Sequence, residues 1–278
     1  MTLTLHIVGT GAIGSLLAAG AERASHPYSI YSRHSSPDYV KVMSDDEQIV
    51  RVTALGSPLP RLTGNDVLVV PVKAYQVESA LLQWRDLLSE RTPVVLMHNG
   101  MGGAELARTL IPAQPLFVAT TSHGALKERA ELVRHTGAGE TVLGFAPHYK
   151  VSNAQRNQVF DVFSSCLPPV RWHSNMQAAL WQKLAVNAVI NPLTALFDIP
   201  NGALLENRYQ PQVSALCEET ARVMTASGVT STAPELINAV QEVARRTASN
   251  FSSMHQDVKH GRRTEIDAIS GYIVQQAK

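Results

Sequence analysis

Residues 3–24, LTLHIVGTGAIGSLLAAGAERA, decide the fold that the sequence predicts. The segment Leu3–Val8 has the pattern of a strand, and Ser15–Ala24 is small and apolar enough for a helix that packs on a sheet. The turn between them has the glycine spacing that allows a tight bend, lets backbone amides approach a pyrophosphate, and lets helix and strand pack closely. Such a pattern alone is often only a loop, whereas its place between a strand and a helix indicates nucleotide binding. The predicted nucleotide-binding residues are Gly9, Thr10, Gly11, Ala12, Ile13 and Gly14.

The residues after the second predicted strand indicate which nucleotide binds. The strand Tyr28–Tyr31 ends in Ser32 and Arg33, where an NAD site usually places an acidic residue for the ribose 2′-hydroxyl. An arginine at this point suits the 2′-phosphate of NADP instead. We therefore predict NADP(H) as the cofactor, with Arg33 at its 2′-phosphate. The alternative is that Arg33 is a solvated loop cation.

Two later strands also end in polar residues. The apolar run Asp66–Val72 is followed by Lys73, and Pro93–Met97 is followed by His98 and Asn99. Ligands of doubly wound sheets bind at the carboxyl ends of the strands, so we expect Lys73 and Asn99 to reach the cofactor or the substrate. A lysine that ends a strand at the surface is the alternative for Lys73, and we interpret His98 as structural.

Strand patterns stop near residue 173, and the remainder is helical. We predict an α/β fold: a doubly wound, Rossmann-like sheet over residues 1–173 that binds NADP, and an all-helical catalytic domain over 174–278. The other predicted elements are β-rich Val40–Leu62, helix Tyr75–Leu88, strand Leu116–Thr121, hairpin Glu131–Leu143, helix Val159–Leu167, and helices Ala178–Leu196, Gln212–Ala226, Ala233–Ala248 and Thr264–Gln276.

The first helix of the second domain carries polar residues on an otherwise apolar surface. Lys183, Asn187 and Asn191 recur at every fourth position and so form one stripe. Their desolvation is costly unless something polar meets them, either neighbouring loops in a core or a ligand in a cleft. Pro192 is expected to kink or end this helix next to Asn191.

Three further residues in the second domain are candidates for the same cleft. Asn201 follows Pro200 in a turn, where it can point back at the cleft or simply form the turn. Ser253 lies between the last two predicted helices, and Glu265 lies in the first turn of the last one, where an acidic residue is favourable for the helix dipole alone.

Composition excludes several classes of protein. The 278 residues are 45% hydrophobic, and 24 basic against 23 acidic residues give a net charge of +1. A protein with this balance presents no large electrostatic surface for nucleic acid or an anionic membrane. The N-terminus lacks the pattern of a signal peptide, and Cys166 and Cys217 have no metal-binding or redox spacing. We expect a cytoplasmic protein without a metal, as a monomer or a small homo-oligomer.

Five segments, which together span nearly the whole chain, match the motifs of one protein family in sequence and in order. They are GTGAIG from Gly9, PVKAYQV around Lys73, HNGMG around Asn99, LWQKLAVNAVINPLTALFDIPNG from Leu180, and SSMHQDVKHGRRTEID from Ser252. Together they resemble the ketopantoate reductase (2-dehydropantoate 2-reductase) family. The last two are specific to this family, whereas the glycine pattern and the Lys-x-x-x-Asn helix also occur in related β-hydroxyacid dehydrogenases. Members of the family continue past the position of Lys278 through a further helical tail, and the departure puts closure of the cleft in doubt.

The resemblance implies roles for individual residues. Lys183 would be the proton donor, with Glu265 either orienting it or bonding the substrate. The substrate would contact Lys183, Asn187, Asn191, Asn201, Ser253 and Asn99. The cofactor would contact the glycine turn from Gly9 to Gly14 and, beyond it, Arg33, Lys73, Asn99, Ala125 and Glu265.

The hypothesis is therefore an enzyme that reduces ketopantoate to pantoate with NADPH, in the biosynthesis of pantothenate and coenzyme A. Hydride addition to a 2-oxo acid requires a proton donor at the carbonyl oxygen, and burial should lower the pKa of Lys183 toward the working range. Two alternatives stay open. One is a related NADP-dependent reductase of another 2- or 3-oxo acid, and the other is a non-catalytic NADP(H)-sensing module.

Overall fold

The computed structural model describes residues 2–32, 38–44, 46–146 and 151–278. The chain divides into two compact units. The first comprises Met1–His98 and Gly103–Met176, and the second comprises Asn99–Gly102 and Gln177–Lys278. The assignment of cofactor binding to residues 1–173 and of catalysis to 174–278 stays a prediction.

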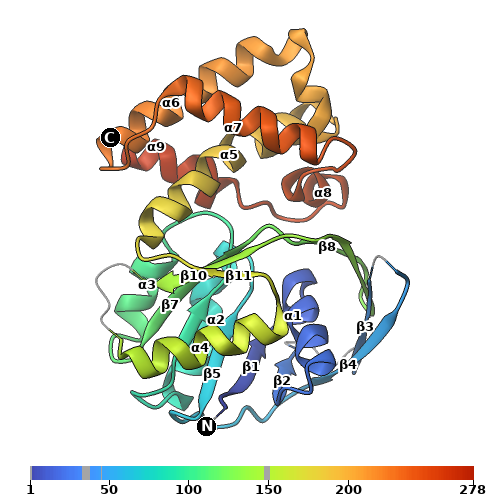
Figure 1. Ribbon diagram of the computed structural model, residues 1–278, viewed down its shortest axis with the longest axis vertical. Helices are drawn as coiled ribbons and strands as arrows, with labels where there is room; N and C mark the ends of the chain where they lie inside the picture. Colours follow the sequence, from blue (N-terminus) through green and yellow to red (C-terminus); the bar gives the residue numbers. More distant parts are fainter. Residues whose placement is uncertain (1, 33–37, 45, 147–150) are drawn as a thin grey trace. The chain divides into compact units, whose positions relative to one another are not determined.

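A mixed sheet of 11 strands, counted over the described residues, forms the centre of the first unit (Figure 1). Its order is β11-β10-β7-β6-β5-β1-β2-β4-β3-β9-β8, and the strands from β7 to β2 are parallel. The strands are β1 (Thr4–Val8), β2 (Tyr28–Tyr31), β3 (Tyr39–Met43), β4 (Ile49–Leu55), β5 (Asp66–Val70), β6 (Val94–Leu96), β7 (Leu116–Thr121), β8 (Gly124–Arg129), β9 (Leu132–Gly137), β10 (Thr141–Phe145) and β11 (Val170–Trp172).

Helices cover both faces of the parallel strands. The helices are α1 (Ala12–Arg23), α2 (Val77–Trp84), α3 (Gly103–Leu110) and α4 (Asn153–Cys166), with 3₁₀ turns at Ala74–Gln76 and Arg85–Leu87. Side chains of β1 such as Leu5 and Ile7 pack with α1 and α4 in one apolar core. On the other face of the sheet, the ring of Tyr31 on β2 contacts the ring of Trp84 on α2 edge to face, with the ring centroids 5.0 Å apart. The doubly wound α/β architecture predicted for this part of the chain is confirmed.

Strand β8 and its neighbours depart from the predicted pattern. The hairpin predicted at Glu131–Leu143 is wrong in its pairing, because β9 pairs with β8, and β10 pairs antiparallel with β7 from Thr141 and Thr121 onward. The charged half of β8 concealed a strand, since its sequence GALKER lacks a clean alternation. As a result α1 contacts β3, β4, β8 and β9 as well as β1 and β2, and Figure 1 shows the curled sheet around it.

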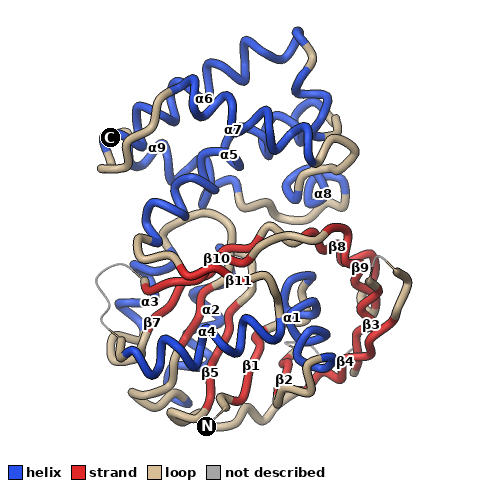
Figure 2. Tube along the Cα trace, viewed as in Figure 1, coloured by secondary structure: helices blue, strands red, loops and turns tan. Residues whose placement is uncertain are grey.

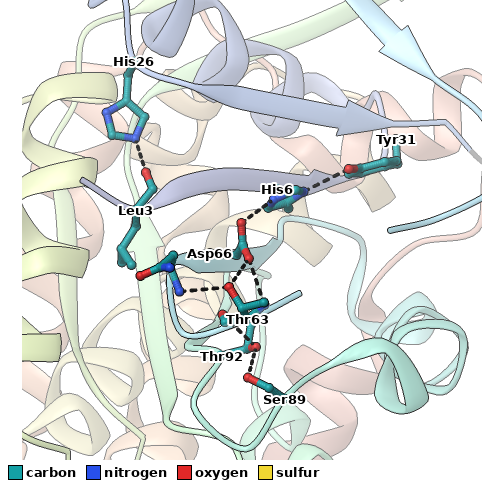
Figure 3. Close-up of polar contacts among 9 residues, drawn as sticks. Leu3, His6, His26, Tyr31, Thr63, Asp66, Ser89 and Thr92 are labelled. Atoms are coloured by element: carbon teal, nitrogen blue, oxygen red, sulfur yellow. Dashed lines mark hydrogen bonds and ion pairs between the residues drawn. The ribbon is translucent and has the colours of Figure 1, made fainter. Parts of the chain in front are cut away.

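A chain of polar side chains, buried at Tyr31 and His6 and open to solvent at Thr63, crosses strands β2, β1 and β5 (Figure 3). His6 Nε2 lies 3.1 Å from Asp66 Oδ1, and its Nδ1 lies 2.9 Å from the Tyr31 hydroxyl. Because a carboxylate only accepts, Nε2 carries the proton, and Nδ1 of the neutral ring accepts from Tyr31. The backbone N–H and the hydroxyl of Thr63 donate to Asp66 Oδ2, both at 2.8 Å. The chain is satisfied with Asp66 ionised and His6 neutral.

This arrangement predicts lower stability at acidic pH. Burial lowers the pKa of His6, against the opposing effect of Asp66. Burial acts to raise the pKa of Asp66, but the hydrogen bonds from Thr63 and His6 outweigh it and hold that pKa below its usual value. Both groups therefore bind protons more readily in the unfolded chain, so the free energy of unfolding should fall as the pH drops below about 6.5 and again below about 4.

Urea unfolding of the wild-type protein and of Asp66→Asn across the acidic range measures this effect. The variant should be less stable near neutral pH and should lose less stability at the most acidic values. Parallel pH curves for the two proteins would contradict the assignment of the acid sensitivity to this chain.

The described residues of the second unit are helical or irregular (Figure 2). The helices are α5 (Met176–Phe197), α6 (Gln210–Ala226), α7 (Ala233–Arg246), α8 (Ser253–Lys259) and α9 (Tyr272–Gln276), with 3₁₀ turns at Asn201–Leu205 and Asn207–Tyr209 and a π-helical turn at Asp267–Gly271. Apolar side chains of α5 such as Trp181 and Val189 pack with Cys217 of α6 and Val240 of α7. The predicted helical region is confirmed. Within the described residues no helix is long and apolar enough to cross a membrane.

Helix α5 does not end at its proline. Pro192 lies inside the helix, which continues to Phe197, so of the two expected effects, a kink or an end, the end does not occur. Proline has no backbone N–H, so the helix lacks one backbone donor at Pro192. In the following turn the Thr194 hydroxyl adds a side-chain hydrogen bond, which it donates to the Ile190 carbonyl at 2.7 Å. Buried Leu193 and Thr194 also hold the last turn in the core of the unit.

Candidate functional site

The glycine-rich turn of the first unit has the geometry of a phosphate cradle. Gly9 has φ +91°, a conformation that side chains rarely adopt, and a Cβ on Gly14 would lie 2.4 Å from the Gly9 carbonyl oxygen. Gly11 is exposed, and a Cβ there would meet nothing within 4 Å. This open backbone precedes α1, whose first turn has no side-chain cap. The turn therefore fits a pyrophosphate held by the first amides of α1.

A lysine that the sequence did not single out contacts this turn. Lys127 of β8 places its Nζ 2.6 Å from the Thr10 carbonyl oxygen. One residue separates Lys127 from Ala125, so both lie on the same face of the strand. Had the strand been recognised, the prediction of Ala125 as a cofactor contact could have led to Lys127.

The other cofactor candidates of the first unit lie at strand ends. Lys73 is half-buried and directly precedes the 3₁₀ turn after β5, where its backbone N–H is 3.3 Å from Gln76 Oε1. Ala125 lies at the start of β8 and packs against the core around α1. Arg33, the predicted partner of a 2′-phosphate, lies outside the described residues.

The polar stripe of the second unit lies on α5 as predicted. Asn191 is buried, while Lys183 and Asn187 are half-buried. Burial lowers the pKa of Lys183 to about 8, and the negative charge of Glu265 acts in the opposite direction. The effect of desolvation on the pKa of Lys183 thus exceeds that of the carboxylate. The ammonium therefore loses its proton at a pH much closer to neutral than an ordinary lysine does.

Glu265 links three segments of the second unit. Its side chain is only 4% exposed, and the Asn99 side-chain amide donates to Glu265 Oε2 at 3.3 Å. The segment Asn99–Gly102 belongs to this unit, where Met101 N donates to the Ala268 carbonyl at 3.1 Å. A Cβ on Gly100, at φ +83°, would lie 2.4 Å from that same carbonyl oxygen. The structure therefore brings Lys183, Asn99 and Glu265 together, although they come from distant parts of the sequence.

Asn201 and Ser253 occupy different local environments. The Asn201 side-chain amide donates to the Thr247 hydroxyl at 2.9 Å, while its buried Oδ1 has no hydrogen-bond partner in the described part of the chain. Ser253 is exposed at the first position of α8. The preceding Ser252 caps α8, and its hydroxyl donates to Thr194 Oγ1 of α5 at 2.7 Å, because the hydrogen of Thr194 is used by the Ile190 carbonyl. Ser253 is thereby held near the end of α5.

No group of three or more metal-ligating side chains occurs among the residues that the structure describes. The two features with chemical capacity are the nucleotide cradle and the lysine of lowered pKa beside a buried carboxylate. A dinucleotide and a proton donor are what carbonyl reduction requires. These features are typical of the class of nicotinamide-dependent oxidoreductases.

Comparisons with known proteins agree with this class. The family model described as ketopantoate reductase PanE/ApbA matches residues 5–148, and the model of its C-terminal domain matches residues 175–278. The 2-dehydropantoate 2-reductase of Vibrio cholerae is 39% identical over 99% of this chain and 91% of its own length. The chain therefore belongs to the ketopantoate reductase family, and the resemblance found in the sequence is confirmed.

Solved structures show the same fold. A PanE/ApbA family ketopantoate reductase from Ralstonia eutropha JMP134 has a TM-score of 0.84 and 26% identity, covering 99% of this chain and 91% of that one. A D-mandelate dehydrogenase with NADH and anilino(oxo)acetate has a TM-score of 0.89 at 21% identity, covering 99% and 92% of the two chains. The second likeness bears on the fold alone.

Proposed function

We propose that this protein is an NADPH-dependent 2-dehydropantoate 2-reductase that converts ketopantoate to pantoate in the cytoplasm, for the synthesis of pantothenate. The observation that carries the proposal is Lys183, a helical lysine whose pKa burial lowers to about 8 beside the buried Glu265. Membership of the ketopantoate reductase family, with a 39% identical relative named for this reaction, gives the substrate.

The first unit would hold the cofactor. Backbone amides from Gly11 to Gly14 would bind its pyrophosphate. Lys73 follows the carboxyl end of β5, where the rest of a dinucleotide binds in such sheets, and Ala125 comes four residues after the carboxyl end of β7. Arg33 follows the second strand in place of an acidic residue, which favours the 2′-phosphate of NADP. When bound, NADPH supplies the hydride that reduces the carbonyl carbon of the substrate.

Lys183 would supply the proton. Its ammonium hydrogen-bonds the carbonyl oxygen of the 2-oxo acid, stabilises the negative charge that develops there, and transfers a proton to that oxygen as the alcohol forms. This transfer leaves Lys183 as a neutral amine, and its pKa of about 8 makes that form much less costly than for an ordinary lysine. The negative charge of Glu265 favours the protonated form of Lys183 at neutral pH. The hydrogen bond from Asn99 holds the Glu265 carboxylate in place.

The amides and hydroxyl of the second unit would bind the substrate. Asn187 and Asn191 follow Lys183 on one stripe of α5, and they suit the carboxylate and hydroxyl of ketopantoate. Asn201 offers a buried carbonyl oxygen without a partner in the described residues, which suits a hydroxyl donor. Ser253 is exposed at the start of α8, where the cap at Ser252 fixes it.

The competing function is reduction of another 2-oxo acid. A D-mandelate dehydrogenase with NADH and anilino(oxo)acetate shares the fold. A catalytically silent NADP(H) sensor is disfavoured, because a sensor has no use for a half-buried lysine beside a buried carboxylate and the side-chain amides of the same helix.

Steady-state kinetics with ketopantoate and phenylglyoxylate, each with NADPH and with NADH, separates these functions. Ketopantoate with NADPH should have the highest kcat/KM, since a site built to hydrogen-bond a substrate hydroxyl discriminates strongly against an acid that lacks it. A higher kcat/KM for phenylglyoxylate would support the alternative reductase. Equal efficiency with the two cofactors would contradict the role of Arg33, and nucleotide binding without turnover would support the sensor.

A further inference from the structure

Lys127 brings a positive charge to a turn whose own residues carry none. The motif Gly9–Gly14 contains no charged side chain, and α1 has no acidic residue in its first turn. The Nζ of Lys127 reaches the turn from β8 and lies 2.6 Å from the Thr10 carbonyl oxygen. The contact spans 117 positions of sequence, so it depends on the packing of β8 beside α1.

Among the residues that the structure describes, the ammonium of Lys127 donates to one neutral carbonyl. An ammonium has three hydrogens, and Thr10 accepts one of them. Lys127 is half-buried, and burial lowers its pKa while the charge of Glu131 acts in the opposite direction. The protein therefore keeps a partly desolvated cation at this point, which is costly unless an anion joins it.

The position of the contact tells which anion that is. Thr10 immediately precedes Gly11, the residue whose exposed and open backbone begins α1. A pyrophosphate bound to the first amides of α1 would come next to this peptide. An ammonium already hydrogen-bonded to the Thr10 carbonyl can then turn its remaining hydrogens to a phosphate oxygen without a large movement.

We propose that Lys127 is a further cofactor-binding residue, which donates to the pyrophosphate of NADP(H) while it holds the Thr10 carbonyl. The inference rests on the proposed use of NADP(H) and adds a residue that the glycine motif does not contain. Because a pyrophosphate contact does not distinguish the ribose 2′ position, Lys127 should strengthen binding without setting the preference between NADPH and NADH.

Calorimetric titration with cofactor fragments, in the absence of any oxo acid, tests this role. The ligands are NADPH, 2′-phospho-ADP-ribose, which has the pyrophosphate, and 2′-AMP, which lacks it. In Lys127→Met the Kd of the first two should rise about 10- to 100-fold, as expected for a lost hydrogen bond to a charged group. The Kd of 2′-AMP should change less than about twofold, and Lys127→Arg should recover most of the affinity because it keeps the charge.

Two further variants separate charge from structure. Lys127→Gln keeps a neutral donor for the Thr10 carbonyl, so it should bind 2′-phospho-ADP-ribose as weakly as Lys127→Met does. Lys41→Met removes an exposed lysine of β3 and should leave every Kd unchanged. Wild-type affinity in Lys127→Gln, or an equal loss for 2′-AMP, would overturn the inference and leave the proposed function intact. A wild-type protein that binds no NADPH would overturn both.

Discussion

A Lys183→Ala variant is expected to reduce ketopantoate about 10²–10⁴-fold more slowly than the wild-type enzyme, which is the usual loss on removal of a general acid. The loss should appear mainly in kcat, because the proton is transferred only as the alkoxide develops. The affinity for NADPH should stay near the wild-type value, since the cradle for the nucleotide lies in the first unit. Stopped-flow measurement of NADPH oxidation together with calorimetric titration of NADPH separates the two effects.

The matched control is Lys259→Ala, which removes an exposed lysine from α8 of the same unit. It should retain the wild-type rate. Added primary amines should restore part of the activity of Lys183→Ala but none in the control, because they replace the missing acid. A Lys183→Ala enzyme whose rate of ketopantoate reduction is within a few-fold of the wild-type rate would contradict the assignment of Lys183 as the proton donor.

Gly20→Ala is expected to have the largest effect on stability. Gly20 lies where α1 crosses the end of α4, and a Cβ there would be 1.6 Å from the Cys166 carbonyl oxygen and 2.7 Å from its carbonyl carbon. Both atoms are backbone, so the helices must separate to admit one methyl group. Overpacking of this kind costs about 3 kcal/mol or more, which exceeds the roughly 1 kcal/mol that alanine gains over glycine in a helix.

Chemical unfolding of Gly20→Ala against the wild type measures the loss, and the yield of folded protein reports it if the variant does not fold. Gly271→Ala is the control, because it adds the same methyl group in a helical turn whose nearest neighbours lie 3.7 Å away. That variant should be as stable as the wild type or slightly more stable. A Gly20→Ala protein of wild-type stability would show that α1 and α4 do not pack as closely as described.

Local features of the sequence predicted much of the fold. The strand, glycine turn and helix of residues 3–24 are contiguous, and each residue type has a steric reason to be there, so the pattern could be read directly. The stripe of Lys183, Asn187 and Asn191 likewise follows from helical periodicity alone. Helices α3 and α8 were not predicted, because helices of 8 and 7 residues leave little room for a periodic pattern.

Contacts between distant segments could not be read in this way. Asn99 and Glu265 are 166 positions apart, and nothing in the pattern of either segment points to the other. The pairing of β10 with β7, in place of a hairpin with β9, depends on the closure of the sheet around α1. The helix continues beyond Pro192, where the Thr194 hydroxyl bonds the Ile190 carbonyl and buried Leu193 and Thr194 hold the last turn in the core.

The pH dependence of kcat/KM for ketopantoate reduction by NADPH tests most directly whether Lys183 is the proton donor. The donor must be protonated, so kcat/KM should be constant at lower pH and should fall as the pH rises through the pKa of Lys183, about 8. This decrease should be absent from the residual activity of Lys183→Ala. A profile that stays flat up to the ordinary pKa of lysine, about 10.4, or a variant that keeps the same decrease, would contradict the account.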